Sequence, residues 1–350
     1  MEGIVLIIFS LIIFSIPLAR KIYFSDIQNK EEKISTSRDL FFDWLKGLSI
    51  IAVIIIHVSY FYSFYFGQPH PFFNIINNLS RFAISIFFIS SGILLKPLAN
   101  KKSALTKFYT KKIVRIFLPY IIIVSALAMF TGTSIKHFLY LLISGQAAVP
   151  YYFVVVLLQF YLLYPALSLL RNSKIFLYIS FLITLSSYLY PETWRIFGIP
   201  LFGKYLFFFQ YGIYMRNYFI IYQKKYFQTQ ILFWLSIIII YWLIVFNFDY
   251  RFYNVRLFYG LAIFNFLFLL RDKINLNNWL QKILIKSGQL SLWIFLLHFF
   301  VVELFYKLLN NYSHNIYLDF SIILLLSTIV SFGVAYICDI IYKGVLKLFK

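Results

Sequence analysis

Apolar segments long enough to cross a membrane recur along the whole chain, separated by short charged or turn-rich breaks. A helix needs roughly 20 mostly apolar residues to span the hydrocarbon core. Eleven segments meet this pattern, at about residues 3–19, 43–66, 74–95, 114–130, 152–170, 175–190, 200–215, 228–246, 255–270, 288–308 and 319–342. The pattern predicts an all-α fold, a polytopic transmembrane helix bundle.

Two apolar segments need separate interpretation. Residues 135–150 are interrupted by Gly145 and Pro150, which predicts an interfacial or re-entrant helix rather than a span. The first segment has no preceding basic residue and no small-residue cleavage site, and Arg20 and Lys21 follow it. We therefore interpret it as a retained helix and not as a secretory signal.

The basic residues alternate between successive connections. Every second connection is rich in Lys and Arg, and these connections together with the C-terminal segment hold 24 of the 32 basic residues. Basic loops face the cytoplasm. The alternation predicts a multi-pass protein of a bacterial or archaeal plasma membrane, with its N-terminus outside and its C-terminus in the cytoplasm.

Composition narrows the class of protein further. The chain is 62% hydrophobic and only 13% charged, which excludes a sizeable soluble domain. The net charge of +20 is explained by cytoplasmic loops and anionic lipid, so we expect no nucleic-acid partner. The single cysteine, Cys338, excludes a disulfide framework and a thiolate metal cluster.

Ionisable residues inside spans are the first candidates for function, because burying them in lipid is costly. In the second segment, Lys46 and His57 are eleven residues apart, which places them on one helix face about 16 Å apart along the axis. Asp43 lies one turn before Lys46. A neutral imidazole can accept a proton from a hydroxyl near neutral pH. The alternatives are a lysine that extends to the interface and a histidine in a structural hydrogen bond.

Three further groups of residues attract attention. Arg81 lies in the third segment, before a Ser-Ser-Gly run at 90–92 that favours close helix packing. Lys112 and Arg115 are one turn apart at the start of the fourth segment, suited to bind phosphates or to fix topology. His298 lies in a late apolar segment, either near a site or in a hydrogen bond between helices.

These motifs together resemble the acyltransferase-3 family of integral membrane proteins. The residues 41–57, FFDWLKGLSIIAVIIIH, match a basic residue, ten residues and a histidine, with Lys46 where arginine is commoner. FFISSGILL at 87–95 matches a second motif, and Lys112-Ile-Val-Arg115 before Leu-Pro a third. The late motif runs from Gly288 to His298. The resemblance covers about residues 38–342, so the helix at 3–19 is additional.

The resemblance implies two regions, a helix and cytoplasmic linker at 1–37 and an acyltransferase-like domain of about ten helices at 38–350. It implies transfer of an acyl group, most often acetyl, from a cytoplasmic acyl-CoA to a hydroxyl of an extracytoplasmic carbohydrate or lipid-linked sugar, without a metal. His57 is then the general base, and Asp43 orients Lys46. Lys46, Lys112 and Arg115 hold the donor, Arg81 lines the substrate site, and His298 supports it.

Other functions fit the same composition. An exporter or assembly component for a polysaccharide or lipid-linked sugar also has many helices, many aromatic residues and a basic mouth. It does not require the spacing between Lys46 and His57. The sequence leaves open the acceptor, the acyl length and the oligomeric state.

Overall fold

The computed structural model describes residues 7, 10, 11, 39–65, 70–97, 102–190, 194–216, 227–247, 254–309 and 315–348. The predicted helix at 3–19 and the linker up to residue 37 lie outside these residues, apart from three positions. The described residues are almost all helical. The two strands among them form one short antiparallel pair, β1 (Arg195–Ile196) and β2 (Ile199–Pro200).

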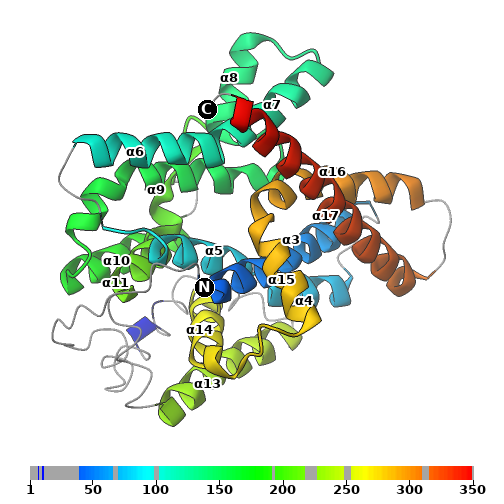
Figure 1. The fold of residues 1–350 in the computed structure, drawn as a ribbon. Helices are drawn as coiled ribbons and strands as arrows, with labels where there is room; N and C mark the ends of the chain where they lie inside the picture. Colours follow the sequence, from blue (N-terminus) through cyan, green and yellow to red (C-terminus); the bar gives the residue numbers. More distant parts are fainter. Residues whose placement is uncertain are drawn as a thin grey trace.

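The described helices follow one another through short connections (Figure 1). The α-helices are α3 (Leu40–Tyr65), α4 (Pro71–Ser80), α5 (Phe82–Ile93), α6 (Lys102–Lys112), α7 (Leu118–Phe130), α8 (Ile135–Ser144), α9 (Tyr152–Leu169), α10 (Lys174–Leu189), α11 (Leu206–Met215), α13 (Phe227–Phe246), α14 (Arg256–Leu269), α15 (Trp279–Gln289), α16 (Ser291–Leu309) and α17 (Ile316–Leu348). A π-helical turn, η1 (Ile113–Phe117), joins α6 to α7, and the 3₁₀ turns are η2 (Val149–Tyr151), η4 (Phe202–Tyr205) and η6 (Arg271–Lys273).

The all-α, multi-pass prediction is confirmed. Seven described helical segments are long and apolar enough to cross a membrane. Each of the ten predicted spans after the first coincides with a described helix, but those at 175–190, 200–215 and 255–270 are shorter than full spans. As predicted, residues 135–150 contain no span: α8 has ten residues, about 15 Å, and ends at Gly145 in the left-handed conformation.

One predicted connection is a helix. The predicted spans at 255–270 and 288–308 leave residues 271–287 as a basic connection, which carries Lys282 and Lys286. Residues 279–289 lie mostly within this connection. They form α15 instead, which begins after Asn278, whose side chain accepts a hydrogen bond from the backbone N–H of Leu280. With 11 residues, α15 is too short to be recognised as a membrane span, so a search for long apolar segments does not find it.

Helix α3 is the centre of the fold. It packs against α15 along its first half and against α4, α5, α16 and α17 (Figure 1). Because α3 carries Asp43, Lys46 and His57, every candidate on this helix is placed by these neighbours.

Two glycines allow α3 and α15 to cross with their backbones in direct contact. A Cβ on Gly288 would lie 1.7 Å from the carbonyl oxygen of Asp43, and one on Gly47 would lie 1.9 Å from the carbonyl oxygen of Leu284. No real side chain tolerates such distances. Small residues let membrane helices approach in this way.

A second crossing of the same kind joins α5 to α11. A Cβ on Gly92 would lie 2.3 Å from the carbonyl oxygen of Phe209, and one on Gly212 would lie 2.2 Å from that of Ile89. The Ser-Ser-Gly run therefore has the packing role expected from the sequence.

We predict that Gly288→Ala destabilises the protein, because the added methyl group forces α15 away from Asp43. Overpacking of this kind costs about 1–3 kcal/mol or more. Gly333→Ala is the matched control, since a Cβ there has nothing within 4 Å. Replacing a helical glycine at an open position stabilises by about 0.5–1 kcal/mol. Thermal unfolding of both variants in detergent measures the difference, and equal midpoints would contradict the role of the crossing.

Candidate functional site

A cavity of about 520 Å³ lies at the end of the bundle where α3 begins. We call it the lysine cavity, because four of its five lining cations are lysines: Lys46, Lys96, Lys111, Lys112 and Arg115. No acidic side chain of the described residues lines it. The predicted donor-binding residues Lys46, Lys112 and Arg115 therefore meet at one cavity, although they come from different helices.

A π-helical turn begins directly after Lys112 and contains Arg115, and both residues line the lysine cavity. Ile113–Phe117 adopt this rare geometry, which is frequent at functional sites. The Lys112 ammonium lies 3.9 Å from the ring centroid of Tyr161, while Arg115 is exposed. The lysine is thus held against an aromatic wall, and the arginine stays free to move toward a ligand.

Lys46 and Asp43 form an ion pair one helical turn apart. The Nζ of Lys46 lies 3.8 Å from Asp43 Oδ1, and Asp43 is buried beneath the crossing with α15. Asp43 is fourteen residues from His57, about 21 Å along the helix. It acts on Lys46 and has no contact with the imidazole.

The second motif at 87–95 also lines the lysine cavity. Phe87, Ser91, Leu94 and Leu95 contribute to its wall, opposite Ser291 and Leu292 of the late motif. Motifs about 200 residues apart in the sequence thus line a single cavity.

A smaller cavity of about 180 Å³ contains His57, and we call it the histidine cavity. Its polar lining consists of His57, Tyr60, Asn77, Arg81 and Tyr152. The remaining wall is apolar. This cavity has about a third of the volume of the lysine cavity, which leaves room for a small chemical group beside the imidazole.

Asn77 connects Arg81 to the backbone next to His57. Its Nδ2 donates a hydrogen bond of 3.0 Å to the carbonyl oxygen of Ile56, and its Oδ1 accepts one of 3.0 Å from Arg81 Nε. Arg81 lies deep in the bundle where α4 ends and α5 begins. It remains solvent-accessible because it lines a cavity.

His298 lies directly behind His57. The two ring centroids are 5.1 Å apart, and His298 is fully buried. His298 Nδ1 lies 3.1 Å and 2.8 Å from the carbonyl oxygens of Ile294 and Phe295. Carbonyls only accept, so Nδ1 carries the proton and Nε2 is an acceptor. Neither His298 Nε2 nor His57 Nδ1 has a hydrogen-bond partner among the described residues.

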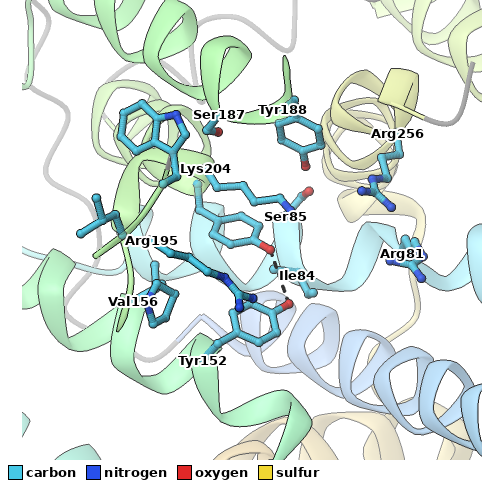
Figure 2. Close-up of a pocket in the computed structure, with 14 residues that line it drawn as sticks. Arg81, Ile84, Ser85, Tyr152, Val156, Ser187, Tyr188, Arg195, Lys204 and Arg256 are labelled. Carbon is cyan, nitrogen blue, oxygen red and sulfur yellow. Dashed lines mark hydrogen bonds between the residues drawn. The ribbon is translucent and has the colours of Figure 1, made fainter. Parts of the chain in front are cut away.

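A third cavity of about 370 Å³ lies beyond Arg81 (Figure 2). We call it the arginine cavity, because three of its four cations are arginines: Arg81, Arg195, Lys204 and Arg256. In Figure 2, Lys204 extends across the cavity toward Tyr188, and Arg256 enters from the other side. Tyr205 donates a hydrogen bond of 3.4 Å to Tyr152.

Lys204 is placed in the turn η4, outside the seven candidate spans. The cations of this cavity repel one another, so an anion bound among them would relieve the repulsion.

A tight hairpin positions Arg195. Phe197 and Gly198 have φ angles of 50° and 79°, the positive values of a two-residue turn that matches the strand twist. The hairpin is fastened to α9 by Gln159, whose Nε2 donates a hydrogen bond of 2.8 Å to the carbonyl oxygen of Pro200. Arg195 is therefore held at the cavity by backbone geometry.

The three cavities form one series with His57 in the middle. Phe153 and Phe295 line both the lysine and the histidine cavities, with ring centroids 5.1 Å apart. Arg81, Ile84 and Tyr152 line both the histidine and the arginine cavities. Two phenylalanines thus separate a basic cavity at one end of the bundle from a histidine that opens toward the other.

A family model described as an acyltransferase domain matches residues 39–340, nearly the whole chain. The chain belongs to the acyltransferase-3 family. This membership and the apolar helices make the protein a multi-pass membrane acyltransferase. No curated protein matches it, and no solved structure matches it.

The structure of this acyltransferase adds residues that sequence reasoning missed, namely Trp194, Arg195, Lys204 and Arg256. The sequence did contain a sign that three of these residues could belong to a site. Arg195 lies in a connection nearly bare of charge, and Lys204 and Arg256 lie at the edges of predicted spans on that same side. Conversely, His298, predicted to bind substrate, lines none of the three cavities and contacts His57 instead.

We predict that the lysine and arginine cavities of the acyltransferase open on opposite faces of the membrane. In a Cys338→Ser background, Lys96→Cys should react with a membrane-impermeant thiol reagent from the cytoplasmic face, and Arg195→Cys from the other. Both positions are exposed. Labelling of inverted and right-side-out vesicles measures this, with the cysteine-free protein as control. Reaction of both cysteines from one face would contradict the arrangement.

Proposed function

We propose that the protein is a membrane O-acyltransferase that moves an acetyl group from acetyl-CoA to a hydroxyl of an extracytoplasmic carbohydrate. The main support for this proposal is the position of His57. It lies in a small cavity that shares wall residues with a cation-lined cavity on each side. The donor would enter the lysine cavity from the cytoplasm, and the acceptor would enter the arginine cavity from outside the plasma membrane.

The lysine cavity suits a donor that carries phosphates. Its five cations include Lys112 and Arg115, and an arginine fork binds phosphate oxygens in pairs. Its volume of about 520 Å³ lies within the range of cofactor sites. The thioester end would then pass Phe153 and Phe295 to reach His57.

The histidine cavity favours a short acyl group. At about 180 Å³ it accepts an acetyl group and the reacting hydroxyl but not a long chain. A small cavity beside the imidazole suits a reacting group better than a passing polymer, which favours the acyltransferase over the exporter that composition alone allowed.

In the proposed reaction, His57 removes the proton from the acceptor hydroxyl as its oxygen attacks the thioester carbonyl. A carbon–oxygen bond forms and the carbon–sulfur bond breaks. The thiolate of the donor leaves and takes the proton from His57, so the histidine returns to its neutral form.

His57→Gln is predicted to lower acyl transfer by about 10²–10⁴-fold, since general base catalysis contributes this much. Mass spectrometry of surface glycans from cells with wild-type protein, the variant or no gene detects the missing acyl mass. Equal expression and thermal stability of the variant are the control. Full acylation in the variant would rule out His57 as the base, and no acyl difference between cells with and without the gene would rule out the proposed function.

In the proposed reaction His298 Nε2 would accept a hydrogen bond from His57 Nδ1, which leaves His57 Nε2 as the base. The two rings are in contact in this structure, but the two nitrogen atoms are not hydrogen-bonded. His298→Phe keeps the ring volume and removes the acceptor. We predict about a 10²-fold lower kcat, an unchanged KM for the thioester and a shifted pH–rate profile. Stopped assays of thiol release measure all three. A purely structural role would leave the pH profile of the remaining activity unchanged.

A further inference from the structure

We propose that the arginine cavity is a binding site for a negatively charged acceptor, a glycan that carries a carboxylate or phosphate group. This inference rests on the proposed function and names the substrate class of the same site. It is argued from four cations, which a neutral sugar would not require, and from an aromatic wall, which suits a carbohydrate.

The cations come from separate parts of the fold. Arg81 lies between α4 and α5, Arg195 in β1, Lys204 in η4 and Arg256 at the start of α14. No Asp or Glu of the described residues lines the cavity. Like charges gathered from four elements in one partly buried volume repel, and a bound anion reverses the sign of that interaction.

Two of the cations are held against the same aromatic ring. Lys204 Nζ lies 5.3 Å and the Arg256 guanidinium 5.7 Å from the ring centroid of Tyr188. Such contacts fix long side chains over a ring face. The ring of Tyr188 therefore holds both cations close together before a ligand binds. A carboxylate or phosphate group can contact two such cations at once.

The rest of the lining suits a carbohydrate. Trp194, Tyr152 and Tyr205 supply flat apolar faces and hydroxyl groups, and Ser85 and Ser187 add further hydroxyls. The Trp194 ring packs directly on Gly203, where a Cβ would lie 2.0 Å from a ring carbon. A sugar ring has the same mixture of apolar faces and hydroxyl edges.

Arg81 links this cavity to the reacting atoms. It lines both the arginine and the histidine cavities, and Asn77 holds its Nε. An anion among Arg81, Lys204 and Arg256 would place a neighbouring hydroxyl of the same glycan toward His57. The acceptor would thus be selected by a charge close to the acylated position.

The direct test measures binding to purified full-length protein in phosphatidylcholine nanodiscs. The probes are tetragalacturonate against galactotetraose, which differ at C6, and glucose 1-phosphate against glucose. We expect at least tenfold tighter binding of one anionic probe than of its neutral partner. We expect this preference to be lost in K204M/R256M and retained in K204R and in Lys136→Met, an exposed cation outside the cavity.

Two results would overturn the inference. One is equal binding of each charged probe and its neutral partner, or no binding of any anionic probe. The other is a preference that K204M/R256M leaves intact. Nanodiscs with added phosphatidylglycerol form a further arm. Anionic lipid that displaces the probes from wild-type protein, and has no effect in K204M/R256M, would identify the ligand as a lipid headgroup and also overturn the acceptor.

A test in cells separates this inference from the proposed function. Mass spectrometry should locate the acyl group on a repeat that contains a uronic acid or glycosyl phosphate, and K204M/R256M should lower acylation at least tenfold. Acylation that depends on His57 but falls on a neutral repeat would overturn the anionic acceptor and leave the proposed function standing. If glycans from cells with and without the gene carried the same acyl groups, the proposed function would be overturned. The nanodisc experiment would still show whether the arginine cavity binds an anion.

Discussion

The direct backbone contact between α3 and α15 is the constraint on which the rest of the site depends. Gly47 and Gly288 let the two helices touch, and Asp43 lies at the point of contact. Asp43 then fixes Lys46, and the same straight helix carries His57 about three turns further on. A membrane interior lacks a strong hydrophobic force between helices, so close packing of this kind is what holds charged residues in register. The glycines of two sequence motifs therefore set the helix geometry that places Lys46 in the wall of the lysine cavity.

Much of the fold was predictable because a bilayer imposes a simple rule on length and polarity. The ten spans after the first coincide with helices because each had to satisfy its own backbone hydrogen bonds. Helix α15 was missed because it is short and amphipathic. The predicted segment at 200–215 proved shorter as an α-helix because it begins with the 3₁₀ turn η4. The β1–β2 hairpin was missed because it depends on Phe197 in an unusual backbone conformation.

The site was predictable where its residues lie in one segment or a local motif. Lys46 and His57 share a helix face, and Lys112 and Arg115 share a turn, so spacing alone related them. The pairing of His57 with His298 crosses 241 residues of sequence and depends on how α16 packs against α3. Likewise, Arg81, Arg195, Lys204 and Arg256 meet only in three dimensions. No pattern in a single sequence predicts that four scattered cations line one cavity. An isolated arginine in a charge-poor loop, such as Arg195, is nevertheless a reason to consider that loop as part of a site.

The pair of phenylalanines between the lysine and histidine cavities has a consequence for the membrane itself. Polar cavities on both sides of a thin partition would conduct protons if water joined them, and each charge that leaked would dissipate about 2.3 kcal/mol per 100 mV of membrane potential. Phe153 and Phe295 interrupt that path with apolar rings. In the proposed arrangement, with one cavity open to each face of the membrane, these two rings would keep water from joining the cavities, and the site would not become an ion leak.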